Sequence, residues 1–275
     1  MNNLDKYKYY LINDERSDNT IYCYISDVKK FEDFLCGRPL SKDLAVEYKA
    51  CLKGKYKLTT ANRKICALNA YFKCIGFNDI SLKTYKIQKS NFRDDNKNIS
   101  FEEYQRLVNY AKEKNKIRVL LIIETLASTG IRISELEFVT VESLSENHTF
   151  VNNKGKLREI IIPNGLRLVL KKYCEKSNIH IGPVFSSRNG NPLNRSNIYK
   201  EMKLLAKGAG VKEDKVYPHN FRHFFAYLYY DQTKNIVRLS DLLGHSSIST
   251  TQIYARTNID ACIEEIDSLC TVIVS

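Results

Sequence analysis

The stretch that decides the fold of this chain is Leu242-Leu243-Gly244-His245-Ser246-Ser247-Ile248-Ser249-Thr250-Thr251-Gln252-Ile253-Tyr254. It places a tyrosine nine residues after a histidine. Two basic stretches precede it, Thr129-Gly130-Ile131-Arg132-Ile133-Ser134-Glu135-Leu136 and His219-Asn220-Phe221-Arg222-His223. Two arginines, two histidines and a late tyrosine suit one reaction, in which a phenol oxygen attacks a phosphodiester while cationic groups stabilise the charge on the phosphate oxygens.

These stretches resemble the tyrosine recombinases, the phage-integrase and Xer-type family of site-specific DNA recombinases. The matching motifs are Thr-Gly-Ile-Arg132-Ile-Ser-Glu-Leu, His219-x-x-Arg222-His223, Leu-Leu-Gly-His245 and Tyr254, in the family's order and spacing. The resemblance covers nearly the whole chain, because the amino-terminal third is similar to the family's core-binding domain. It implies a mainly α-helical fold with a small antiparallel β-hairpin, and a two-domain C-shaped clamp around DNA.

Composition favours a nucleic-acid partner. The 275 residues carry a formal net charge of +12, which favours binding to a polyanion, and 43% are hydrophobic, enough for packed cores. Neither an apolar membrane span nor a signal peptide is visible, so a cytoplasmic location is expected. The eight cysteines form no C-x-x-C pair and are expected to be structural, several of them on apolar helix faces, so a metal site is not expected.

Two domains are predicted, with a short linker between them. Residues 1–88 show helical periodicity and are expected to form a core-binding domain, while the polar residues 89–99 form the linker. Residues 100–275 would be the catalytic domain with a carboxy-terminal tail. A capping box at Ser100-Phe101-Glu102-Glu103 is expected to begin its first helix.

Local patterns predict most elements. In the first domain, helices are expected over about 21–35, 41–52 and 61–75, with Thr59 and Thr60 as caps of the last one and Gly76 ending it. In the second domain, residues 149–152 and 158–163 predict a hairpin, and Val184-Phe185 with the turn at 188–190 predicts another short strand pair. Further helices are expected over about 164–177, 194–208, 219–230, 235–243 and 247–254.

The resemblance implies a role for each site residue. Arg132 and Arg222 would bind the two non-bridging phosphate oxygens, because guanidinium groups stay charged and bind oxygens in a fork. Tyr254 would be the nucleophile and would form a 3′-phosphotyrosyl intermediate with a free 5′ hydroxyl. His219 would accept or donate a proton near the phosphate, and His245 would donate a hydrogen bond to a phosphate oxygen. No metal or nucleotide cofactor is implied.

The supporting residues leave alternatives open. Glu135 would orient a catalytic arginine or histidine, or else form only a surface ion pair. His223 is expected either to support the catalytic residues from behind or to be structural. Lys154, at the hairpin tip, would protonate the departing 5′ oxygen. The family hairpin commonly reads Gly-Lys-Gly-x-Lys-x-Arg, whereas the hairpin of this chain is one residue shorter, so Lys156 could hold that position instead.

Several partners are implied, beginning with double-stranded DNA. A basic cluster in the first domain would contact DNA phosphates or would simply be a solvated helix face; it comprises Lys53, Lys55, Lys57, Arg63 and Lys64. The apolar residues after Tyr254 would dock into a neighbouring protomer and give a cyclic tetramer on DNA, or else pack on their own domain. Accessory DNA-bending proteins are a further possible partner.

Three functions remain open. The first is a site-specific recombinase, of the Xer, invertase, transposon or integrase kind. The second is a relaxing enzyme like a type IB topoisomerase, against which the compact length argues. The third is a catalytically silent DNA-binding regulator on the same fold. The complete set of predicted site residues favours the first, because a silent protein has no use for such a set.

Overall fold

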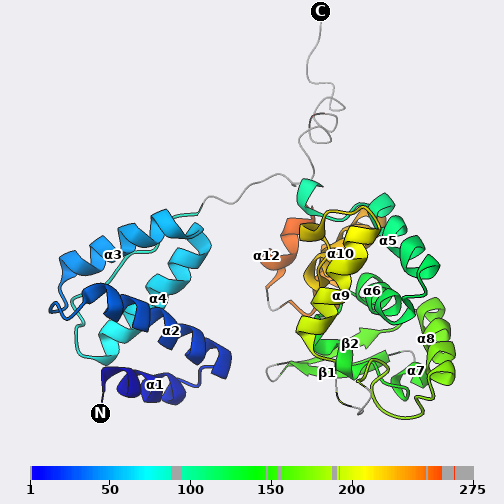
Figure 1. The fold of residues 1–275 in the computed structure, drawn as a ribbon, viewed down its shortest axis with the longest axis horizontal. Coiled ribbons are helices and arrows are strands. Elements are labelled where there is room, and N and C mark those ends of the chain that lie inside the picture. Colours follow the sequence, from blue (N-terminus) through cyan, green and yellow to red (C-terminus); the bar gives the residue numbers. More distant parts are fainter. Residues whose placement is uncertain are drawn as a thin grey trace, which may run out of the picture. The chain divides into compact units, whose positions relative to one another are not determined.

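The computed structural model describes residues 2–87, 95–146, 148–153, 156–187, 191, 193–245, 247–255 and 263, and the chain divides into two compact units, Met1–Lys89 and Ser90–Ser275. The first unit is helical (Figure 1). Its elements are α1 (Asn3–Asn13), α2 (Asp18–Leu35), α3 (Lys42–Lys55) and α4 (Leu58–Cys74). The sequence predicted the last three, but α4 begins one residue before Thr59, so Thr59 and Thr60 lie inside the helix and do not cap it.

Aromatic and aliphatic side chains of all these helices meet in the core of the first unit, which includes the fully buried Tyr7, Phe31 and Phe72. Gly76 ends α4 with a left-handed φ of +90°, as predicted. The chain then runs in extended form along α4. The side chain of Asn69 exchanges two hydrogen bonds with the backbone of Leu82, at 2.8 and 2.9 Å. Such paired bonds satisfy extended backbone where no neighbouring strand is available.

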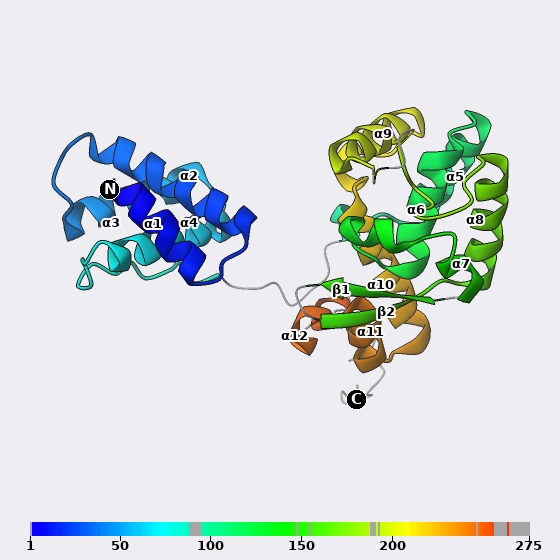
Figure 2. The same cartoon turned by 90° about the horizontal axis from the view of Figure 1, so that it is seen from below.

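The second unit is built around α6 (Figures 1 and 2). The residues of this helix are apolar on most sides. A helix that is apolar all round must be buried, and α10 packs along it. Ser100 forms the predicted capping box with Glu103 before α5, with bonds of 2.9 and 3.2 Å. The elements are η1 (Asp95–Lys97), α5 (Phe101–Glu113), α6 (Ile117–Thr129), η2 (Ile133–Phe138), α7 (Ser143–Glu146), β1 (His148–Asn153), β2 (Lys156–Ile161), α8 (Asn164–Lys176), α9 (Arg195–Gly208), η3 (Glu213–Lys215), α10 (Pro218–Thr233), α11 (Ile236–Leu243), α12 (Ile248–Thr251) and η4 (Gln252–Ala255).

The predicted hairpin is present as the antiparallel pair β1 and β2, which runs from His148 opposite Ile161 to Asn153 opposite Lys156. Val184 and Phe185 do not form the predicted strand, although the Ser187 N–H donates to the Asn191 carbonyl at 2.8 Å on either side of the expected turn. The Val184 N–H instead donates to the Val139 carbonyl at 2.9 Å, beside an isolated bridge between Thr140 and Pro183. The expected turn at 188–190 lies outside the described residues. A mostly helical fold with a small antiparallel sheet is therefore confirmed, while the clamp arrangement stays a prediction.

The cysteines are only partly interior. Cys174 is buried, as expected for a small apolar side chain, but Cys36, Cys51 and Cys66 are exposed. Among the described residues, no group of three histidine, cysteine, aspartate or glutamate side chains could hold a metal ion. Within that same part of the chain, no helix combines the length and the apolar character needed to cross a bilayer.

Candidate active site

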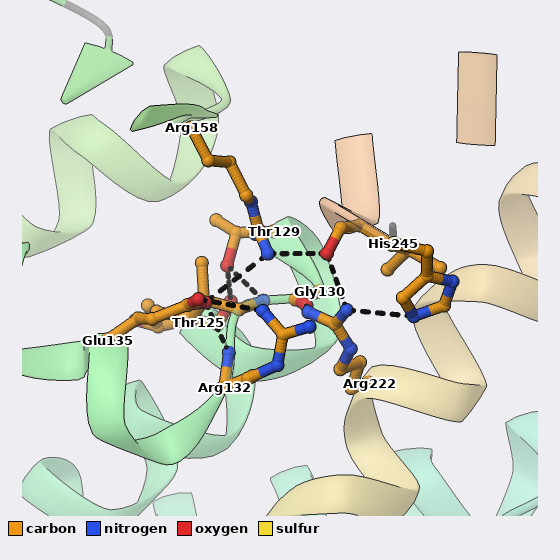
Figure 3. A network of polar contacts seen from close by, with 10 residues as sticks. Thr125, Thr129, Gly130, Arg132, Glu135, Arg158, Arg222 and His245 are labelled. Atoms are coloured by element: carbon orange, nitrogen blue, oxygen red, sulfur yellow. Dashed lines mark hydrogen bonds and ion pairs between the residues drawn. The ribbon is translucent and has the colours of Figure 1, made fainter. Parts of the chain in front are cut away.

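Arg132 and Arg222 come together because a tight turn follows α6. Gly130 ends this helix with a left-handed φ of +62°, and its carbonyl accepts a 2.6 Å hydrogen bond from Arg222 Nη1 (Figure 3). A Cβ at this glycine would lie 2.4 Å from Phe225 Cδ1, closer than real atoms approach. Both the backbone angle and the close packing therefore require glycine here. The turn places Arg132 directly before η2, as the N-cap of that element.

The guanidinium of Arg222 is almost completely buried, with 1% of the residue exposed. Its Nη2 donates to the Leu243 carbonyl at 2.6 Å, and Arg158 Nη1 donates to the same carbonyl at 2.7 Å. This carbonyl lies at the carboxy-terminal end of α11, where the helix dipole is negative and stabilises cations. Burial, followed by the charges of Arg132 and Arg158, lowers the pKa of Arg222 to about 9. Arg222 therefore remains charged at neutral pH.

Glu135 supplies the negative charge that these arginines need. Its carboxylate accepts bonds from the Arg132 backbone N–H at 2.8 Å and from Arg132 Nη1 at 2.9 Å, and it lies 3.4 Å from Arg158 Nη1. Burial alone would raise the pKa of Glu135, but the bond from the Arg132 backbone and the charges of both arginines outweigh burial and lower it. Glu135 is thus an ionised, 1% exposed carboxylate that orients arginines, and not a surface ion pair.

His245 follows Gly244 and lies against Arg222. The His245 Nε2 atom is 3.1 Å from Arg222 Nη2, and Nδ1 is 2.8 Å from Thr251 Oγ1. Because a guanidinium only donates, Nε2 accepts here, and the ring proton sits on Nδ1. Partial burial, followed by the charges of Arg222 and Arg132, lowers the pKa of His245 to about 4. In this structure His245 is therefore neutral and accepts at Nε2, whereas the sequence predicted a donor to phosphate.

Tyr254 lies in η4 and is 3% exposed. Its ring packs edge-on against Tyr227, with centroids 5.1 Å apart, and its hydroxyl lies 2.9 Å from His223 Nδ1. Burial raises the pKa of Tyr254 to about 12, although the charge of Arg222 opposes this. The phenol is therefore protonated at neutral pH. His223 was predicted to be a supporting or structural residue, and it contacts the tyrosine hydroxyl directly.

His219 lies on the same face of α10, one turn before His223, and the two rings are 4.4 Å apart. Its side chain is exposed. Partial desolvation, followed by the charges of Arg222 and Arg132, lowers the pKa of His219. The structure thus gathers Arg132, Glu135, His219, Arg222, His245 and Tyr254 around the carboxy-terminal ends of α6 and α11 and the start of α10.

Comparison with known proteins identifies the family. Residues 97–260 match the model of the phage integrase family, and residues 4–75 match the model of the phage integrase N-terminal SAM-like domain. The chain belongs to the phage integrase family. It is a tyrosine recombinase, a member of the class of enzymes that cleave and rejoin DNA in site-specific recombination.

Named relatives agree with this family. Tyrosine recombinase XerA of Pyrococcus furiosus is 32% identical over 265 residues, covering 92% of this chain and 88% of that protein. Tyrosine recombinase XerC of Leptospira interrogans is 30% identical over 268 residues, covering 90% and 85%. A solved lambda integrase tetramer bound to a Holliday junction has a TM-score of 0.74 at 19% identity, covering 93% of this chain and 76% of that one. That last likeness shows the fold alone.

One buried site residue of this tyrosine recombinase was missed. Arg158, on β2, is 8% exposed and joins the hairpin to Glu135 and Leu243, while its Nε and Nη2 have no hydrogen-bond partner among the residues that the structure describes. Strand alternation could have found it, because Arg158 shares the buried face of β2 with Ile160. An arginine on a buried face needs a carboxylate or carbonyl partner, which is a sign of a functional or structural site.

Other predicted residues are placed differently or not described. Lys154 lies outside the described residues, and so does the side chain of Lys156, so the choice between them stays open. In the first unit, Lys64 corrects a prediction. It is 4% exposed, forms an ion pair with Asp27 and lies 4.7 Å from the Tyr56 ring centroid. A buried, paired lysine is not available to a DNA phosphate.

The rest of the basic cluster remains at the surface. Lys53, Lys55 and Lys57 are exposed on and after the last turn of α3. Arg63 is also exposed, with 42% of its side chain accessible, but it shares Asp27 with Lys64. The three lysines are therefore the members of the cluster that are best placed to bind a polyanion, and Arg63 could do so only in competition with Asp27.

Proposed function

We propose that this recombinase cuts and rejoins DNA at specific sites through a 3′-phosphotyrosyl intermediate on Tyr254. The observation that carries the proposal is the convergence of two guanidinium groups, a histidine and a tyrosine on one small region. Arg132 keeps 35% of its side chain exposed while Glu135 holds it in place, so a phosphate can reach it. The buried Arg222 adds a fixed positive charge behind it.

In the proposed reaction, Arg132 and Arg222 stabilise the charge that develops on the non-bridging oxygens. Preorganised donors of this kind are each worth about 10²–10³ in rate. His245 turns its Nε2 from Arg222 to the incoming phosphate, for which it must gain a proton or change tautomer. Lys154, or Lys156 in its place, protonates the 5′ oxygen, and the hydroxyl of another strand then reverses the attack. Because the two arginines stabilise the developing negative charge, the proposed reaction requires neither a metal ion nor a nucleotide.

The partner we propose is double-stranded DNA. The net charge of +12 and the exposed lysines of α3 support it. A relative in this fold is solved as a tetramer on a Holliday junction, which supports a cyclic tetramer here, with the tail after residue 255 exchanged between protomers. That tail lies almost wholly outside the described residues. Accessory DNA-bending proteins and the choice among integration, excision, inversion and resolution belong to the same proposal.

Capture of DNA that is covalently linked to the protein tests the proposal and identifies the recombination site. Wild-type protein and Tyr254→Phe are incubated with sheared genomic DNA from the source cell, quenched with detergent, and the protein-linked DNA is sequenced. We expect adducts with wild type alone, concentrated at one sequence. Binding by both proteins without adducts would instead favour the catalytically silent regulator. Adducts spread over unrelated sequences would favour a relaxing enzyme.

A further inference from the structure

The hydroxyl of Tyr254 contacts His223, a histidine for which the sequence predicted only a supporting or structural role. Its Oη lies 2.9 Å from His223 Nδ1, with ring centroids 5.5 Å apart and planes inclined by 55°. His223 follows Arg222 directly on α10, so the helix that carries the buried arginine also carries this contact. His219, the histidine expected to manage the proton, is exposed and makes no hydrogen bond to Tyr254 within the described structure.

The direction of this bond follows from burial. Tyr254 is 3% exposed and its phenol is protonated, so the hydroxyl hydrogen needs an acceptor inside the protein. Within the described part of the chain, His223 Nδ1 is the acceptor that the hydroxyl reaches. The phenol therefore donates, the Nδ1 lone pair accepts, and the imidazole proton sits on Nε2.

We propose that His223 is a catalytic residue of the recombinase, whose Nδ1 holds the Tyr254 hydroxyl and takes its proton as Oη attacks phosphorus. The inference rests on the proposed function. The O–H bond of tyrosine breaks as an N–H bond forms on His223, and the Oη–P bond forms as the bond from phosphorus to the 5′ oxygen breaks. The 5′ oxygen takes its proton from a separate acid. Rejoining runs in reverse and returns the His223 proton to Oη.

The charges around His223 suit a group that is unprotonated before attack. Burial, followed by the neighbouring His219, Arg222 and His245, lowers the pKa of His223 to about 4. Tyr254 faces the same ring from η4. The Nδ1 lone pair is consequently available at neutral pH. An incoming phosphodiester brings negative charge that offsets Arg222, so His223 becomes a stronger base when substrate is bound.

Two substitutions separate proton transfer from simple packing. His223→Asn keeps a polar atom near the Nδ1 position, whereas His223→Ala removes it. Each is mixed with a nicked duplex that carries the sequence recovered by covalent capture, under single-turnover conditions, and the rate of adduct formation is measured. General-base catalysis contributes about 10²–10⁴, so we expect His223→Ala to be slower by at least about a hundredfold at neutral pH.

The pH profile identifies the role. Asparagine can accept a hydrogen bond from the Tyr254 hydroxyl but cannot take its proton, so we expect His223→Asn to stay nearly as slow as His223→Ala at neutral pH. Raising the pH from about 7 to about 9 should accelerate both variants more than wild type, because hydroxide then replaces the missing base. A His223→Ala rate within about threefold of wild type would overturn the inference, as would a loss that is equal at every pH or one that asparagine fully relieves. Absence of adducts with wild type would instead show that the proposed function fails, and the inference with it.

A measurement without DNA checks the contact itself. In ¹⁵N-histidine NMR spectra of the full chain near neutral pH, His223 should be the tautomer with its proton on Nε2. Tyr254→Phe removes the hydroxyl donor and should shift the Nδ1 resonance, whereas Tyr22→Phe, at an exposed tyrosine of the first unit, should not. If wild-type His223 carried its proton on Nδ1, it could not accept the tyrosine proton, and the inference would be wrong.

Discussion

At the scale of single residues, the site is a balance of buried charges. Arg222 and Arg158 are both buried, and Glu135 is the buried carboxylate beside them. Removing one partner of a buried ionic group costs about 3–5 kcal/mol, because the other charge is left uncompensated. Glu135→Gln keeps the shape and removes the charge, so we expect the free energy of unfolding, measured in urea, to fall by about 3 kcal/mol. Glu137→Gln is the control, because Glu137 is exposed on the same element. An equal fall in the free energy of unfolding of both variants would contradict this account.

The histidines make stability depend on pH. His223 and His245 have pKa values of about 4 in the folded protein, against an ordinary value of about 6.5 in the unfolded chain. Between these values the unfolded chain binds more protons, so stability is present above about pH 6.5 and is lost as pH falls toward 4. Urea unfolding from about pH 7 to about pH 5 should show this decline, and the double variant His223→Asn/His245→Asn should show a flatter one. If the free energy of unfolding of the double variant fell as steeply between about pH 7 and about pH 5 as that of wild type, these histidines would not be the cause of the decline.

At the scale of elements, helix boundaries were predictable from the sequence, whereas contacts between elements were not. The Ser100–Glu103 capping box and the carboxy-terminal end of α4 at Gly76 were predictable, because each depends on residues adjacent in sequence. The partners of His223 and Arg158 were not, because both contacts join elements distant in sequence. Lys64 was misassigned for the same reason, since Asp27, its partner, lies on another helix. Periodicity identifies a buried face but does not say which group meets a charge there.

The turn between α6 and η2 requires glycine at position 130, and replacing that glycine tests the requirement. Gly130→Ala places a Cβ 2.4 Å from Phe225 in a left-handed conformation, so both strain and overpacking oppose it. Overpacking alone typically costs about 1–3 kcal/mol. We expect thermal unfolding at lower temperature and slower adduct formation, because Arg132 follows this turn. Gly165→Ala, in α8, is the matched control: its Cβ meets nothing within 4 Å and it should be neutral or stabilising. Equal effects of the two changes would contradict the argument.

At the scale of the whole molecule, composition indicated a polyanionic partner but not which surface binds it. The two compact units divide near residue 89, close to the polar stretch expected as a linker. The family was recognisable from short motifs, because phosphate chemistry demands charged residue types at fixed spacing along the chain. Which lysines face DNA was less accessible, because charge runs in sequence do not show which members are already paired within the fold.

The last prediction therefore concerns the exposed lysines at the end of α3. Each lysine that contacts a duplex phosphate contributes about 0.9 to the slope of log affinity against log salt concentration. Changing Lys53, Lys55 and Lys57 to glutamine should therefore reduce the slope by up to about 2.7, measured on duplex DNA of random sequence. The charge-matched control changes the exposed Lys8, Lys29 and Lys30. If both triple variants reduce the slope equally, the first unit attracts DNA through its overall charge, and α3 is not a distinct contact surface.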